Sequence, residues 1–521
     1  MSIVDEILAD AAANKGQSFR MENADSEYEP DETGKPEEDG ETGENGEAEN
    51  TENETDTSIV DEVMDGVESA DEIAEEIAEA EEEVKDVEEV LEKVDDFETA
   101  ALVVEQNLDV VFGAIKLNSY NALVSESVQN ALNSTALLTG LKAPQTVVLG
   151  LEHHSTSSSI VFAQESAIQT LKGYGRQALD GIIAFLSWLA DKFRTVWYRY
   201  FMSIDKLKKR SKALEEKVNE AINAGKLTGD ALKFPRSLAK YFYQGAYSGS
   251  VESQGLTISD DKVNVVAPVA YLGEVLKDAT TTTAELNAEL QKAFPELDKL
   301  SDEAIKSFNK SVKGLSVEEL KEKLGKITMP INVNTLEKFA KGVRGTKKDN
   351  VKHSEILPGL GVIEFTEPDD ESGKGYRIRL IRAKLKGEAK KEIGTAFVPN
   401  PRDLIAGIKA INKNIEIMER LKAELEDTAK LTKTIQSMIK RFESKAAPIH
   451  QRLKASVTFD KEQREAFGQV RMITNAMSGV VKYLGEPGRS LLPYSVSVTA
   501  NQLRVYSKLL AKAGVLKEAE A

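Results

Sequence analysis

The chain lacks cysteine altogether and has only 4 histidines among its 521 residues. Disulfides and cysteine-based metal sites are therefore excluded, which suits a reducing compartment, and little remains for histidine-based metal or acid–base chemistry. No apolar run reaches the roughly 18 residues that a membrane-spanning helix needs. The first residues lack the basic and apolar segments of a secretory signal.

Familiar catalytic patterns are absent as well. The sequence contains no GxxxxGK[ST] phosphate loop, no GxGxxG after a strand, no GxSxG elbow and no HExxH zinc motif. Acidic residues are abundant but scattered over solvated helical positions. The sequence predicts a protein that is not an enzyme, with no catalytic residues, no metal and no cofactors.

Charge is distributed very unevenly along the chain. Residues 1–165 contain 43 acidic and 7 basic residues, a net charge of -36, whereas residues 166–521 contain 44 acidic and 60 basic residues, a net charge of +16. Such asymmetry indicates an acidic leader beside a body that binds polyanions.

The acidic part begins with a short amphipathic segment whose apolar side is a candidate targeting element, made of Ile3, Val4, Ile7 and Leu8. Residues 21–57 have almost nothing apolar to bury, which predicts disorder. The pentapeptide SIVDE at residues 2–6 recurs at residues 58–62, which suggests a duplicated docking element. Residues 59–97 have apolar positions at helical spacing and form either a solvated helix with one packed stripe or a partner-binding helix.

A serine-rich stretch separates the acidic part from the body. Residues 155–159 read STSSS, which predicts a flexible, protease-accessible linker. His153 and His154 lie in it without a carboxylate cluster, so they are interpreted as linker residues and not as metal ligands.

The body opens with an aromatic and basic helix over residues 167–222, which contains both tryptophans. Its apolar spacing fits a core helix, an interfacial membrane helix or a nucleic-acid contact through cations that neutralise phosphates. The candidate nucleic-acid contacts are Lys192, Arg194, Arg199, Lys206, Lys208, Lys209, Arg210 and Lys212.

Further along, residues 229–330 predict several short helices broken at Gly and Pro. Residues 362–365 and 376–380 predict two strands, the second with Arg377 and Arg379 on a solvated face. Residues from 400 onward predict long helices that start at Asn400 and Pro401, stop at Pro448, and pair as an antiparallel bundle or coiled-coil hairpin.

The fold class expected is mainly α: an elongated helical bundle or coiled-coil hairpins with one small β-hairpin, preceded by an acidic leader that is partly disordered and partly helical. The expected regions are 1–57 (disordered leader), 58–142 (acidic helical propeptide), 143–165 (linker and cleavage region), 166–228 (aromatic-basic helix), 229–360 (helical middle), 361–400 (β-hairpin) and 401–521 (helical bundle).

One short motif lies where the charge changes sign: Ala163-Gln164-Glu165, followed by Ser166. This small-x-Glu pattern, the acidic-then-basic layout, the aromatic-basic helix and the amphipathic start together resemble internal head proteins of phiKZ-like giant tailed phages. The resemblance implies an acidic propeptide that directs packing into the prohead and a prohead protease that cuts after Glu165. It also implies scaffold or capsid partners and a location in the virion, after assembly in the host cytoplasm.

Physically, a leader of opposite charge would mask the basic body until both are packaged, and the body would then bind DNA through its phosphates without sequence specificity. Self-association through the C-terminal helices is a further expectation. Two alternatives stay open: an ejected effector or enzyme carried in the head, and a cellular helical adaptor with a permanent acidic tail.

Overall fold

The computed structural model describes residues 70–146, 157–247, 251–252, 262–310, 316–329, 334–367, 376–383, 385–386, 395–398, 400–455 and 461–516. The candidate targeting residues Ile3, Val4, Ile7 and Leu8, both SIVDE copies, His153 and His154 lie outside these ranges.

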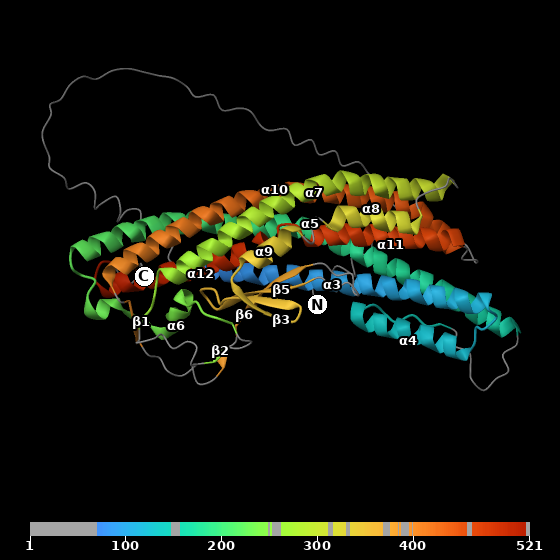
Figure 1. The fold of residues 1–521 in the computed structure, drawn as a ribbon, viewed down its shortest axis with the longest axis horizontal. Coiled ribbons are helices and arrows are strands. Elements are labelled where there is room, and N and C mark those ends of the chain that lie inside the picture. The colour runs from blue at the N-terminus through green and yellow to red at the C-terminus, as the bar shows by residue number, and fades with distance from the viewer. Residues whose placement is uncertain are drawn as a thin grey trace, which may run out of the picture.

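Long helices dominate this part of the chain and lie mostly along the long axis of the molecule (Figure 1). The principal helices are α3 (Ala70–Lys116), α4 (Ala122–Thr139), α5 (Ser157–Asn223), α7 (Ala267–Lys310), α8 (Val317–Met329), α10 (Pro401–Ala455), α11 (Lys461–Lys482) and α12 (Gly488–Lys512). The expected mainly helical, elongated class is therefore confirmed.

The helices form one bundle with a continuous core. Helix α10 packs along α7 and α5, α3 packs along α5, and α4 lies beside α3 near one end of the molecule (Figure 1). Helix α12 contacts α3, α5, α7 and α10. Most of its residues are buried, which suits its mixture of Leu, Val and small polar residues.

Local sequence signals set the start of α10 as expected. The Asn400 side chain accepts a hydrogen bond from the Arg402 backbone N–H at 2.9 Å, and Pro401 occupies the first helical position. The expected stop at Pro448 is wrong, because α10 continues to Ala455.

Two other expectations about helices need correction. The region 229–330 is not a series of short helices, since α7 runs for 44 residues through Pro295. Pro295 is exposed, and the apolar face of α7 on both sides of it is buried against the bundle, so packing stabilises the helix across the proline. Similarly, α5 begins at Ser157, so part of the predicted serine-rich linker is helical.

The predicted strand pair is present and belongs to a larger sheet. Strands β5 (Gly361–Thr366) and β6 (Arg377–Arg382) pair antiparallel, with Phe365 opposite Ile378 and Ile363 opposite Leu380. Two strands that the sequence analysis did not predict, β3 (Gly345–Lys348) and β4 (Val351–Ser354), extend it to the order β3-β4-β5-β6. Both strands are short and mostly polar, β3 is exposed and β4 is mostly half-buried, so their apolar alternation is weak.

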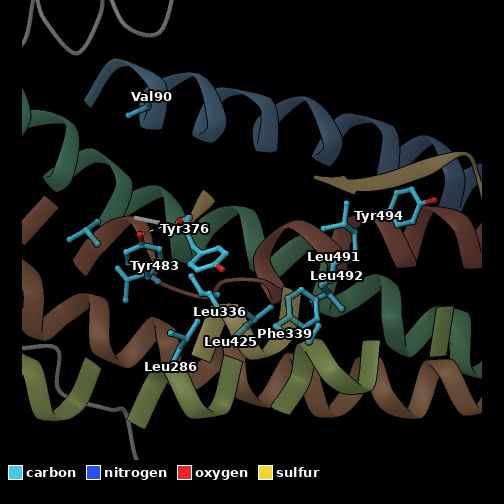
Figure 2. Packing of buried hydrophobic residues seen from close by; sticks show 14 of the residues in the cluster. Val90, Leu286, Leu336, Phe339, Tyr376, Leu425, Tyr483, Leu491, Leu492 and Tyr494 are labelled. Atoms are coloured by element: carbon cyan, nitrogen blue, oxygen red, sulfur yellow. Dashed lines mark hydrogen bonds between the residues drawn. The ribbon is translucent and has the colours of Figure 1, made fainter. Parts of the chain in front are cut away.

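The sheet is held against the bundle by aromatic side chains. Phe365 meets Phe339 of α9 (Leu336–Gly342) edge to face, with 5.7 Å between the ring centroids. The Tyr494 hydroxyl of α12 accepts a hydrogen bond from the Gly361 N–H at 2.9 Å and donates one to the Pro358 carbonyl. Figure 2 shows Phe339, Tyr376, Tyr483 and Tyr494 among the buried residues of this region. The Tyr483 hydroxyl also donates to the Tyr376 carbonyl at 3.2 Å.

The remaining elements are short. They are the 3₁₀ segments Gly229–Leu232 and Lys240–Phe242, helix α6 (Arg236–Ala239), and the two-stranded pairs β1 (Lys233–Pro235) with β8 (Thr395–Phe397) and β2 (Val251–Glu252) with β7 (Leu385–Lys386).

Candidate functional site: the acidic helix α3 on the basic face of the body

Helix α3, from the acidic part of the chain, lies directly on the body. Its apolar stripe is almost fully buried and recurs at helical spacing: Val90, Val94, Phe97, Ala101, Val104, Leu108 and Val111. Phe97 meets Phe185 of α5 edge to face, with 5.2 Å between the ring centroids. These residues belong to the same core cluster as α5 and α12. The described part of the predicted leader is therefore packed into the body.

A glycine on α5 makes room for this contact. A Cβ atom placed on Gly181 would lie 2.4 Å from Cε1 and 2.6 Å from Cδ1 of Phe97, closer than such atoms approach in real structures. Only glycine therefore lets the Phe97 ring lie this close to the α5 backbone at position 181.

Carboxylates flank the apolar stripe and meet cations of β6 and α11. Asp95 pairs with Arg377 and, at 2.6 Å, with Lys482, which also binds Glu98 at 2.8 Å. Two outer pairs, Glu92 with Arg379 and Glu105 with Arg471, extend the row in both directions along α3. We call these eight side chains and the buried stripe the α3 interface.

The charge on Lys482 is maintained although the side chain is partly buried. Desolvation lowers the pKa of Lys482, but the attraction of Glu98 and Asp95 outweighs it, so the pKa lies above its ordinary value. Lys482 is therefore charged at neutral pH and binds both carboxylates.

Apolar burial contributes more to the α3 interface than its ion pairs do. Each large buried side chain stabilises by about 1.5–3 kcal/mol, whereas a partly exposed ion pair contributes about 0–1 kcal/mol. The side chains of Arg377 and Arg379 remain 40% and 41% exposed, so their pairs belong to the weaker class. The ion pairs mainly fix where α3 lies along the body.

The sequence analysis found only part of this interface. Arg377 and Arg379 were recognised as one face of a strand and expected to be solvated, but both pair with α3. The carboxylates at positions 92, 95, 98 and 105 were missed. Their spacing of three or seven residues places them on one side of a helix, which is a signal for a charged partner face.

The candidate cleavage motif, Ala163-Gln164-Glu165, lies within α5 and not in a linker. Ala163 is fully buried, Glu165 is exposed, and Gln164 and Ser166 are partly buried. The carbonyl of Ala163 lies 3.5 Å from the hydroxyl of Tyr120, which donates to it from the connection between α3 and α4. The motif is thus near the start of a helix and partly covered by the preceding chain.

The candidate nucleic-acid contacts are dispersed along α5. Lys209 and Lys212 are exposed and Lys206 is partly buried, whereas Lys208 pairs with Glu419 at 2.6 Å, which raises its pKa. The prediction of a nucleic-acid contact at Arg210 is wrong. Its side chain is 1% exposed and donates a hydrogen bond to Ser507 at 3.0 Å, so it does not face a DNA phosphate in this fold. Its helical position points inward, toward α12. The side chains of Lys192, Arg194 and Arg199 are outside the described set.

Among the residues that the structure describes, no cluster of three or more His, Asp or Glu is arranged to hold a metal ion. Over the same ranges, none of the helices combines the length and apolar character that crossing a membrane requires.

Long packed helices, a small supporting sheet and an internal acid–base interface define an elongated helical protein. The comparison with family models is specific: residues 58–508 match the model of phiKZ-like phage internal head proteins. The match covers most of the chain and runs through both the acidic and the basic part, so the chain belongs to this family. No significant match was found among curated proteins or among solved structures. Family membership makes the chain an internal head protein of a phage and locates it in the virion head.

Proposed function

We propose that this protein is packaged in the phage head as a precursor, that the prohead protease cuts it after Glu165, and that its body associates with packaged DNA without sequence specificity. The proposal is carried by the family match over residues 58–508. The reversal of net charge at the small-x-Glu motif supports it. Scaffold or capsid proteins are the partners proposed for the acidic N-terminal part.

Cutting after Glu165 requires a local opening of α5, because a protease binds its substrate in an extended form and Ala163 is buried. The motif lies within the first three turns of a helix that begins at Ser157, and helix ends open at the lowest free energy. We therefore expect cutting to be limited by unwinding of residues 157–166, and to be faster while the precursor is still folding.

The N-termini of the protein in purified heads test the cleavage. We expect a major N-terminus at Ser166, measured by mass spectrometry. Glu165→Ala should abolish it, and because Glu165 is exposed, the substitution should leave stability unchanged within about 0.5 kcal/mol. Glu318→Ala is the matched control, since Ser316-Val317-Glu318 is also a small-x-Glu motif with an exposed glutamate, and it should leave the Ser166 end intact. Heads that contain only the uncut chain would contradict the proposal.

DNA association is proposed to use the exposed lysines of α5. Replacing Lys209 and Lys212 by Glu should reduce the slope of log binding constant against log salt by about 2, since each phosphate contact contributes roughly 0.9. The control variant replaces Lys277 and Lys321 by Glu, which are exposed on α7 and α8 and change the net charge equally. An equal loss in both variants would mean that only net charge matters and that α5 is not the contact.

A further inference from the structure

We propose that a cut between α4 and α5, or after Glu165, does not release the N-terminal part: residues 70–146 stay bound to the body, and the processed protein is a complex of two pieces. The inference rests on the proposed function, because the cut that would produce the two pieces during head maturation is the proposed cleavage after Glu165. The docking itself depends only on the α3 interface and not on which protease makes the cut.

The first argument is the extent of shared core. The stripe from Val90 to Val111 is buried against α5, α11 and α12. A cut after Glu165 severs only the first turns of α5, and the α5 residues that contact Phe97, Gly181 and Phe185, lie beyond the cut. Helix α4 adds further contacts, since the Thr139 and Tyr174 hydroxyls are hydrogen-bonded at 2.9 Å and Leu132 is 1% exposed. Separation would return all of this apolar surface to water.

The second argument is charge balance. The piece that a cut after Glu165 separates, residues 1–165, has a net charge of -36, opposite in sign to the net charge of +16 on residues 166–521. Long-range attraction therefore acts in the same direction as packing. The α3 interface places part of this opposite charge in direct contact, at Asp95 with Arg377 and at Glu98 with Lys482.

Retention has a consequence for DNA binding. Arg377, Arg379, Arg471 and Lys482 would stay occupied by α3 carboxylates after the cut. Cutting alone would then not expose a new phosphate-binding face, and DNA would have to bind cations outside the α3 interface, such as Lys209 and Lys212 on α5.

The test uses the full-length chain with the recognition sequence of a site-specific protease in place of residues 148–154, between α4 and α5. The folded protein is cut and passed over a gel-filtration column at ~0.1 M and ~1 M NaCl, which span weak and strong screening. We expect both pieces to elute together in equal amounts at both salt concentrations, with DNA retention unchanged by the cut. An N-terminal piece that elutes separately at either salt, or DNA retention that rises on cutting, would overturn the proposal.

Substitutions in the cut protein identify what holds the pieces together. Phe97→Ala should weaken their association by about 100-fold or more, because it removes a large side chain from the shared core. Leu102→Ala is the control on the same helix, since Leu102 is 40% exposed, and it should change the association by less than about 3-fold.

Equal effects of the two substitutions would count against the packed interface. If Phe97→Ala does not fold, the unsubstituted cut chain in stepwise urea gives the same answer: one joint transition supports retention, and early loss of the N-terminal piece overturns it.

Failure of this inference and failure of the proposed function are separable. Co-elution after the engineered cut shows whether the two pieces stay bound, and it does not depend on where the chain is cut in heads. The N-terminal residue found in purified heads shows whether the chain is processed, and it does not depend on whether the pieces stay bound.

Discussion

The contact between Gly181 and Phe97 gives a prediction whose sign depends on the tertiary structure. Gly181 lies inside α5, where replacing glycine by alanine should stabilise an isolated helix by about 1 kcal/mol. Here the new methyl group would lie 2.4 Å from the Phe97 ring, which is itself held by Phe185. Forcing such a contact in a filled core costs about 1–3 kcal/mol. We therefore expect Gly181→Ala to be destabilising by up to about 2 kcal/mol.

A double-substitution cycle isolates the cause. Phe97→Ala alone should cost about 3–5 kcal/mol, since Phe97 is fully buried. In that background the ring is gone, so Gly181→Ala should become stabilising by up to about 1 kcal/mol. The resulting coupling energy of about 1–3 kcal/mol would report direct contact between α3 and α5.

Gly173 supplies the control, because it lies in the same helix and nothing is within 4 Å of a Cβ added there. Gly173→Ala should therefore stabilise by up to about 1 kcal/mol. Urea unfolding followed by tryptophan fluorescence is suitable, because both tryptophans belong to α5 and Trp188 packs against the core. If Gly181→Ala stabilises the protein as much as Gly173→Ala does, α3 does not lie on α5 and the α3 interface is refuted.

Three further predictions address charge, pH and the sheet. Lys482→Met should destabilise by about 1–3 kcal/mol in urea unfolding, because it leaves Asp95 and Glu98 partly buried with one cation fewer; a change below about 0.5 kcal/mol would argue against the central pairs. Stability should fall as pH rises above about 10. Burial raises the pKa of Tyr271 to about 12 and also raises the pKa values of Tyr483 and Tyr506, so the unfolded chain loses these protons first. The free energy of unfolding should then fall by up to about 1.4 kcal/mol per pH unit for each tyrosine. Urea midpoints that stay level between pH 9.5 and pH 11.5, about the range where free tyrosine ionises, would contradict this. Tyr494→Phe should cost about 1–3 kcal/mol and speed hydrogen exchange at Gly361, whose N–H loses its acceptor; unchanged exchange there would show that Tyr494 does not anchor β5.

The sequence by itself determined the features that depend on neighbouring residues. Asn400 and Pro401 start α10 through a local cap, and the alternation at residues 376–380 places Ile378 and Leu380 toward the core. The partition of charge and the family resemblance were likewise visible in the sequence. Periodicity and caps act over a few residues, so no knowledge of the fold was needed to find them.

Tertiary structure alone decided which of these elements meet. Arg377 is 282 residues from Asp95 along the chain, and no local pattern indicates that an acidic helix pairs with the cations of this strand face. The same holds for Arg210, whose burial follows from the position of α12, and for Pro295, which α7 tolerates because its apolar face is packed on both sides. Pairing of distant elements depends on shape and burial across the whole bundle, and this is why a segment that composition assigns to a separable leader is part of the core.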